Sequence, residues 1–157
     1  MTIGYEGLTP KAFLDLLQRC AVDRIVDVRE LAISRRAGFS KNALSNLLGK
    51  VGIEYTHLPQ LGCPRSIRHD YREDQNWQRY TKRFCAYLAT RDDIVQALGE
   101  LAKTERCCLL CFEEDFNFCH RSFVAERFGE FVGRLKISHL TGPIQGRVVQ
   151  LQALAVA

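Results

Sequence analysis

Short runs of β-branched and apolar residues alternate along the chain with longer segments in which apolar residues recur every three or four positions. The short runs predict strands at residues 2–5, 24–28, 53–57, 107–112 and 136–140. The longer segments predict helices at about residues 9–18, 40–49 and 120–132, and two more within 77–101 that divide near residues 90–92. Strands and helices that alternate in this way join by right-handed crossovers. The expected fold is therefore α/β: an open, mainly parallel sheet with helices on both faces, doubly wound and Rossmann-like or flavodoxin-like.

Two of these helices carry start signals, and one segment lacks any helical signal. Thr9 precedes Pro10, and proline is favoured at the first position of a helix because its missing N–H leaves nothing unpaired. Ser40 stands at the N-cap position of the second helix. Residues 59–74 are polar and rich in arginine, which predicts a long connection. A connection of this length inside a compact domain is usually functional.

The composition fits one folded domain. A chain of 157 residues that is 46% hydrophobic is expected to bury roughly two-thirds of its unfolded surface, so residues 1–157 should form a single core. The first residues show no basic run followed by an apolar core, and no stretch approaches the ~20 apolar residues that span a bilayer. We therefore expect a cytoplasmic protein with no membrane partner. The seven cysteines are odd in number, which argues against a disulfide framework.

Ionisable side chains follow most of the predicted strands. Ligands bind beyond the carboxyl ends of the strands in open α/β sheets, so these side chains are expected to converge. They are Glu6, Arg29, Arg35, Arg36, His57, Cys111, Glu113 and His139. Asp27 lies inside an otherwise apolar strand and needs a partner, for which Arg29 or Arg121 is available.

Residues 107–122, CCLLCFEEDFNFCHRS, combine cysteines, an acidic cluster and a Cys-His-Arg triplet. Three interpretations are open: a metal site, a thiol active site, and an ordinary strand joined to a helix. Structural zinc sites favour cysteine pairs two to four residues apart. Cys111 and Cys119 are eight residues apart, so no metal ligand is assigned.

The thiol interpretation rests on the position of Cys119 at the start of a predicted helix. Free backbone N–H groups and the helix dipole lower the pKa of a thiol there, and they bind phosphate or carboxylate equally well. In the structural interpretation, Cys119 only caps the helix and Arg121 pairs with Glu113 or Asp27. An arginine at a helix start opposes the dipole unless an internal carboxylate or a ligand compensates it.

Four stretches, TIGYEG, VDVRELAISRRAGFSK, GIEYTHLPQLG and LLCFEEDFNFCHR, resemble in that order the signatures of the DUF488 family, a domain of unknown function. The resemblance covers about residues 2–140 and leaves 141–157 as a C-terminal extension. It implies a doubly wound α/β fold with a shared pocket, and it implies no particular activity. The residues at the family's motif positions are Arg29, Ser34, Arg35, Cys111, Glu113, Cys119, His120 and Arg121.

The leading hypothesis is a pocket that binds or processes an anionic ligand, such as a nucleotide, another phosphate-bearing molecule or a nucleic-acid end. Arginine is expected to bind it because its guanidinium group matches phosphate oxygens in pairs. The anion-binding candidates are Arg29, Ser34, Arg35 and Arg121. The catalytic candidates are Cys119 as nucleophile or anion-hole donor, and Glu113 and His120 as general acid or base. The supporting candidates are Glu6, Asp27, His57 and Cys111. A thiol-dependent or acid–base-dependent enzyme of the hydrolase type fits this set.

Two alternatives stay open. One is a non-catalytic nucleic-acid-binding module whose arginine-rich loops contact backbone phosphates. The other is a redox or metal sensor that uses the cysteines. No cofactor is assigned. The apolar tail at residues 146–157 is expected to add a strand or helix or to cover a partner chain, so a homodimer is also open.

Overall fold

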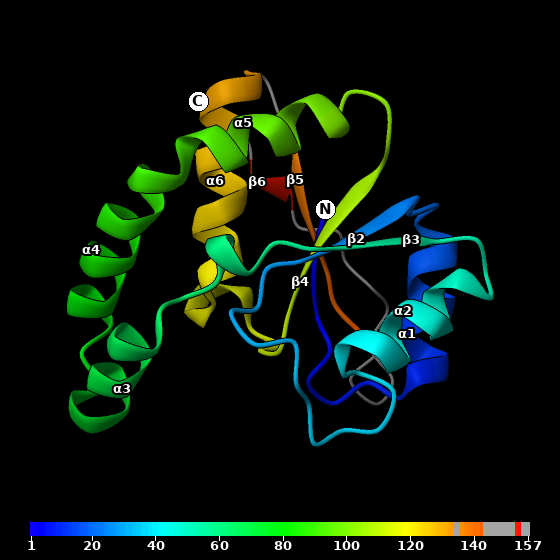
Figure 1. Ribbon diagram of the computed structural model, residues 1–157, viewed down its shortest axis with the longest axis horizontal. Helices are drawn as coiled ribbons and strands as arrows, with labels where there is room; N and C mark the ends of the chain where they lie inside the picture. Colours follow the sequence, from blue (N-terminus) through cyan, green and yellow to red (C-terminus); the bar gives the residue numbers. More distant parts are fainter. Residues whose placement is uncertain (134–135, 143–152, 155–157) are drawn as a thin grey trace.

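The computed structural model describes residues 1–133, 136–142 and 153–154, and it places an open sheet at the centre of the molecule (Figure 1). The sheet has six strands in the order β3-β2-β4-β1-β5-β6. Every neighbouring pair from β3 to β5 is parallel, and β6 is antiparallel to β5. The strands are β1 (Thr2–Gly4), β2 (Arg24–Asp27), β3 (Glu54–His57), β4 (Cys107–Cys111), β5 (Ile137–Leu140) and β6 (Ala153–Leu154). The expectation of an open, mainly parallel sheet is confirmed.

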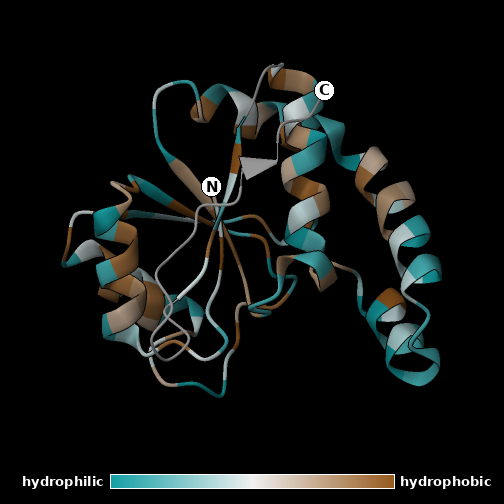
Figure 2. Ribbon diagram, turned by 180° about the vertical axis from the view of Figure 1, so that it is seen from behind, coloured by the Kyte–Doolittle hydropathy of each residue, from teal (hydrophilic) through white to brown (hydrophobic). Residues whose placement is uncertain are grey.

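Helices cover both faces of this sheet, as a doubly wound fold requires (Figure 1). Successive residues of β4 show the two faces: Cys108 and Leu110 lie in one hydrophobic cluster and Leu109 in the other. Helices α1 (Pro10–Arg19) and α2 (Lys41–Gly49) cover the first face. The second face is covered by α3 (Arg65–Asp74), α4 (Trp77–Leu88), α5 (Asp92–Leu101) and α6 (His120–Val132). In Figure 2 brown, apolar segments appear both on strands and on the helices beside them, and much of the α3–α4 hairpin is hydrophilic.

The expectation of a long connection over residues 59–74 is wrong. A 3-10 helix, η1 (Pro59–Leu61), is followed by α3, which ends at Gln75 in the left-handed conformation with φ 51°. Arginine and glutamate are good helix formers, and Ile67 and Tyr71 lie four residues apart on the apolar side of α3. Tyr71 packs against Trp77 of α4 with ring centroids 5.5 Å apart. Because most residues of α3 are charged, its few apolar residues did not form a pattern strong enough to predict a helix.

The two expected helix starts differ in how they are capped. The Thr9 side chain accepts a hydrogen bond from the backbone N–H of Ala12, as an N-cap should. Ser40 occupies the N-cap position of α2, but its hydroxyl makes no cap bond. It instead bonds to the backbone N–H and carbonyl of Ser34, and so folds the loop after β2 onto the start of α2.

The order of the strands gives β4 a special position. In the two common doubly wound orders β1 and β2 are neighbours, whereas here β4 lies between them. The helices that follow β1 and β2 pack on one face, and α6, which follows β4, packs on the other. The chain therefore leaves neighbouring strands toward opposite faces on each side of β4. A crevice opens at such a switch point, beyond the carboxyl ends of the strands.

The C-terminal tail is described only in part. Residues Ala153 and Leu154 form β6 opposite Ser138 and Ile137 of β5, while the expectations for residues 143–152 and 155–157 fall outside the described residues. Among the helices that the structure describes, none is long and apolar enough to cross a membrane.

Gly4 is expected to be essential for the close contact between β1 and the segment after β4. A Cβ atom built at Gly4 would lie 1.7 Å from the backbone oxygen of Glu113, so Gly4→Ala must push these two segments apart. We expect a loss of about 1–3 kcal/mol in the free energy of unfolding, measured by urea denaturation. A Cβ at Gly49 meets no atom within 4 Å, so Gly49→Ala is the matched control and should change stability by about 1 kcal/mol at most. If both substitutions changed the free energy of unfolding by the same amount, Gly4 would not be required for this close contact.

Candidate functional site

A cavity of about 660 Å³ lies over the carboxyl ends of β1, β2 and β4. Tyr5 follows β1, Arg29 follows β2, and Cys111 ends β4, and all three line it. The expected convergence of groups that follow different strands is therefore present at this edge. The loop after β2 and helices α3 and α4 complete the wall.

The floor of the cavity holds a cluster of four side chains: Cys111, Glu113, Cys119 and His120. The Sγ atoms of Cys111 and Cys119 lie 2.9 and 3.1 Å from Oε2 of Glu113. Nδ1 of His120 lies 3.7 Å from Sγ of Cys111, and the opposite ring nitrogen, Nε2, lies 2.9 Å from the carbonyl oxygen of Val28. One sulfur, nitrogen or oxygen atom from each of the four residues lies within 4.8 Å of the others.

Burial and mutual contact shift the pKa values in this cluster in different directions. Burial, strengthened by the neighbouring Cys119, raises the pKa values of Cys111 and Glu113. Burial also opposes ionisation of Cys119, but contacts with Cys111 and His120 and the charge of Arg121 outweigh it and hold the pKa of Cys119 below its usual value. The pKa of His120 is raised, because the interaction with Cys119 outweighs the desolvation of the ring. Of the two thiols, Cys119 is therefore the one whose ionisation the cluster favours.

The predicted nucleophile is the least accessible member of the cluster. Cys119 is 1% exposed and does not line the cavity, whereas Cys111, Glu113 and His120 do. Cys111 was expected to be a supporting residue and Cys119 the nucleophile. The structure brings the two thiols to the same carboxylate, and Cys111 is the thiol on the cavity wall.

Asp27 and Arg29 form the buried ion pair that was expected from the sequence. Nε and Nη2 of Arg29 lie 2.8 and 2.5 Å from the two carboxylate oxygens of Asp27, which is fully buried. Nη1 of Arg29 donates to the hydroxyl of Tyr5 and to the carbonyl of Phe39. The hydroxyl of Tyr55 donates to Asp27 at 2.6 Å. Arg29 therefore joins β2, the segment after β1 and the loop before α2. Part of its side chain also lines the cavity.

Arg121, also predicted to bind an anion, is directed inward. Its side chain is fully buried, and its N–H groups donate to the backbone carbonyls of Glu113 and Glu114 and to the hydroxyl of Thr2. The expected carboxylate partner for this arginine is therefore replaced by carbonyl oxygens. Arg121 does not line the cavity and instead holds the Glu113 loop in place.

Four further arginines form much of the cavity wall. Arg35 and Arg36 come from the loop after β2, and Arg68 and Arg72 are separated by four residues on α3. Arg68 is paired with Glu30. Arg36 donates to one backbone carbonyl, and its Nε is buried without a partner among the described residues. Within the same described residues, Arg35 and Arg72 are exposed, and their guanidinium groups have no hydrogen-bond or ion-pair partner.

Aromatic and aliphatic side chains surround these arginines. Trp77 and Tyr80 of α4 stack with ring centroids 4.7 Å apart, and Phe118 lies 5.4 Å from Trp77. Phe112 and Phe118 are 40% and 56% exposed at the edge of the cavity, and Ile33 beside them is 77% exposed. An arginine-rich cavity with apolar side chains at its edge suits a ligand that has both a charged and a flat apolar part.

The remaining predicted residues divide between the cavity and other places. Ser34 lines the cavity, and its hydroxyl accepts from the backbone N–H of Arg36. His57 bonds to the carbonyl of Arg29 at 2.9 Å and so supports the loop after β2. Glu6 accepts from the backbone N–H of Glu114 and does not line the cavity.

Several wall residues were missed in the sequence. Arg68 and Arg72 fall in the arginine-rich segment that was expected to be a connection, and Trp77 and Tyr80 fall in a predicted helix that was given no role in the site. The four-residue spacing of Arg68 and Arg72 was the signal that could have placed them on one face of a helix. Nothing in the sequence marked Phe118.

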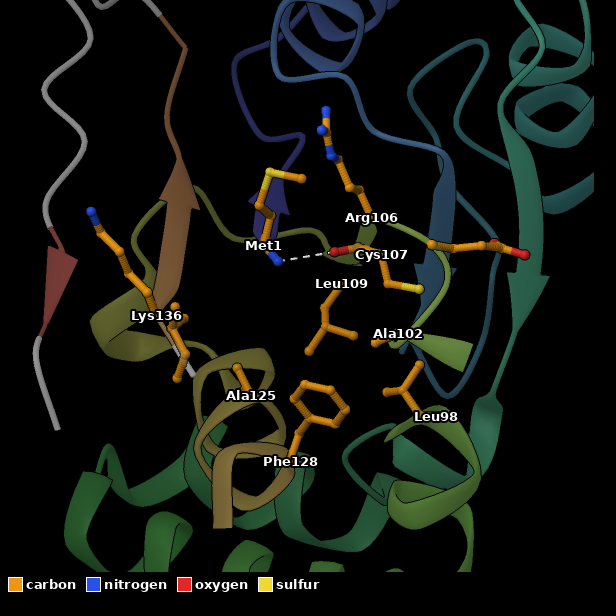
Figure 3. Close-up of a pocket in the computed structure, with 11 residues that line it drawn as sticks. Met1, Leu98, Ala102, Arg106, Cys107, Leu109, Ala125, Phe128 and Lys136 are labelled. Carbon is orange, nitrogen blue, oxygen red and sulfur yellow. Dashed lines mark hydrogen bonds between the residues drawn. The ribbon is translucent and has the colours of Figure 1, made fainter. Parts of the chain in front are cut away.

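A second cavity of about 240 Å³ lies at the opposite edge of the sheet, near the amino ends of β1, β4 and β5 (Figure 3). Its walls are mainly apolar, with contributions from Leu98, Leu109 and Phe128. The backbone nitrogen of Met1 donates to the carbonyl of Cys107 beside it. No cluster of histidine, cysteine or acidic side chains lies there within the described residues, so the first cavity is the candidate site.

Removing the guanidinium of Arg29 should destabilise the protein strongly, because the carboxylate of Asp27 would stay buried without a cation. We expect Arg29→Met to lower the free energy of unfolding by about 3–5 kcal/mol in urea denaturation. The double variant Asp27→Asn with Arg29→Met should be more stable than the single variant. Exposed Arg19→Met, the control, should stay within about 0.5 kcal/mol of the parent. A double variant that is less stable than Arg29→Met would contradict the role of this ion pair.

Comparison of the chain with curated proteins and with solved structures gives no match. The family model described as "Domain of unknown function DUF488" matches residues 9–128. This range includes α1 through most of α6 and therefore the whole cluster at the cavity floor. The chain belongs to the DUF488 family, in agreement with its sequence signatures.

Proposed function

We propose that the cavity binds a ligand that combines a phosphate group with an aromatic ring, namely a nucleotide or the end of a single-stranded nucleic acid. The observation that carries the proposal is the composition of the wall, in which five arginines face only two carboxylates beside a group of aromatic rings. Guanidinium groups bind phosphate oxygens in pairs. Aromatic rings stack on nucleobases with a gain of about 1–3 kcal/mol for each base.

Two features of the arginines support this ligand. Arg35 and Arg72 have no internal partner among the described residues, so each is available to a phosphate. The buried Nε of Arg36 is a donor without an acceptor, which is costly unless a ligand supplies one. The cavity volume of about 660 Å³ lies in the range of roughly 300–1,000 Å³ that is usual for small-molecule sites.

The proposal includes chemistry at the cavity floor. Cys111, Glu113 and His120 line the wall, so a bound ligand is within reach of a thiol, a carboxyl and an imidazole group. A pure binding module has no need to gather these groups under its ligand. Turnover of a bound nucleotide or nucleic-acid end that is lost in Glu113→Gln would separate an enzyme from such a module.

Removing one available arginine should weaken nucleotide binding. Arg72→Gln and Arg35→Gln are each expected to raise the Kd for a mononucleotide by about 10-fold or more, because a charge-assisted hydrogen bond is lost. Trp77 is the one tryptophan of the chain and lines the cavity, so quenching of its fluorescence reports binding. Arg19→Gln has the same change in charge on exposed α1 and should leave the Kd unchanged. Equal Kd values for all these variants would contradict the proposed site.

Salt dependence distinguishes a nucleic-acid end from a free nucleotide. For a short single-stranded oligonucleotide, two available arginines predict a slope of log affinity on log salt of about −1.4, at about −0.7 for each phosphate contact. The Arg72→Gln variant should then show a slope of about −0.7. A slope that is the same in the parent and in this variant would show that the oligonucleotide binds elsewhere.

A further inference from the structure

The cluster at the cavity floor has the donor set of a transition-metal site. Cys111 ends β4, Glu113 lies in the following loop, and Cys119 and His120 begin α6. The spacing of eight positions between the two cysteines argued against zinc in the sequence, because close pairs along the chain are the usual signature. The fold supplies the missing proximity through space, since one donor atom from each side chain lies within 4.8 Å of the other three.

The charge of Glu113 is not balanced by a basic side chain. The described residues show no ion pair to its carboxylate, and its side-chain contacts are to the thiols of Cys111 and Cys119. Arg121 is adjacent, but it donates to the backbone carbonyl of Glu113 and not to the carboxylate. Two thiols and a carboxyl gathered in one buried cluster with a single imidazole are costly to ionise unless a cation is shared between them. A divalent cation between them would replace the thiol protons.

The orientation of His120 is the one that a metal ligand needs. Its Nε2 faces the carbonyl of Val28 at 2.9 Å, so this nitrogen carries the proton and donates. Its Nδ1 faces Cys111 and is the atom that remains for a cation. Histidines that bind metals commonly donate their other ring N–H to a backbone carbonyl or carboxylate, which fixes the ring. Edge-on packing against Phe84, with centroids 5.3 Å apart, restricts the same ring further.

We propose that Cys111, Glu113, Cys119 and His120 bind one Zn²⁺ ion. Two sulfurs, one nitrogen and one carboxylate oxygen suit a tetrahedral zinc site, whereas Mg²⁺ and Ca²⁺ prefer oxygen ligands alone. Ligand atoms of tetrahedral zinc are separated by roughly 3.5 Å, given bond lengths of about 2.0–2.3 Å. The present spacing of the two thiols from Glu113 is slightly shorter, so the ion would spread the cluster by a small amount.

This inference goes beyond nucleotide binding and does not depend on it. Three of the four metal-binding residues line the cavity, so the ion would lie directly behind the cavity wall. Because four protein ligands fill a tetrahedral site and leave no position for water, zinc there would fix the segment between β4 and α6 in place. The thiols would then serve as ligands and not as nucleophiles.

Cobalt substitution tests the site directly. The full chain is treated with a chelator, the chelator is removed, and Co²⁺ is titrated while the absorption spectrum is recorded. We expect one equivalent of Co²⁺ to give a thiolate-to-cobalt charge-transfer band and the intense visible bands of tetrahedral cobalt, and Zn²⁺ to displace it. Cys111→Ser and Cys119→Ser should abolish the charge-transfer band or weaken binding at least 100-fold. Glu113→Gln should weaken binding by about 10-fold or more.

Two controls keep the result decisive. Cys63→Ser removes a buried thiol that lines the same cavity outside the cluster, and Cys85→Ser removes an exposed one, so both should bind Co²⁺ as the parent does.

Should a cluster variant fail to fold, alkylation of the unmodified chain replaces it, with Zn²⁺ expected to slow labelling of Cys111 and Cys119 at least 10-fold. A parent chain without thiolate bands, or equal labelling of these cysteines with and without Zn²⁺, overturns the proposal. Nucleotide binding measured by Trp77 fluorescence on the metal-free chain is a separate readout, so failure of one proposal leaves the other testable.

Discussion

The buried guanidinium of Arg121 is the interaction on which the geometry of the candidate site depends. It lies in the first turn of α6 and connects three parts of the chain: the hydroxyl of Thr2 on β1, and the carbonyls of Glu113 and Glu114 in the loop after β4. Carbonyl oxygens in this loop would otherwise face the core without donors. The same contacts fix where Glu113 enters the cavity and how far α6 lies from the sheet. An arginine at the positive end of a helix is costly alone, and here several carbonyl dipoles compensate it.

Much of the fold followed from the sequence because local and global signals agreed. All five predicted strands are present with ends within one residue of the expected positions. The pairing of Asp27 with Arg29 was also predictable, since a carboxylate in an apolar strand has few possible partners. The helix α3 was not predicted, because its charged residues mask a narrow apolar stripe that is evident only once α4 packs against it.

The site was predicted less completely than the fold, because the direction of each side chain could not be predicted. Sequence order shows which residues follow which strand, but it does not show which way a side chain turns at a loop. Cys119 and Arg121 were placed correctly at the start of a helix, yet both face the interior, while Cys111 faces the cavity. The approach of Cys119 to Glu113 depends on how the loop between β4 and α6 folds back. That loop is set by long-range contacts of Arg121, which no local pattern shows.

The cavity is assembled from two parts that have different origins in the chain. The thiol, carboxyl and imidazole groups come from the central strand β4 and the helix that follows it. Arg68, Arg72 and Trp77 come from the α3–α4 hairpin, which lies between β3 and β4 in the chain and stands at the outer side of α6 in Figure 1. The inner side of this hairpin packs into the core, but the guanidinium of Arg72 on its exposed side has no hydrogen-bond or ion-pair partner among the described residues. Substitutions on that side can therefore reshape the cavity wall while the thiol, carboxyl and imidazole groups stay in place.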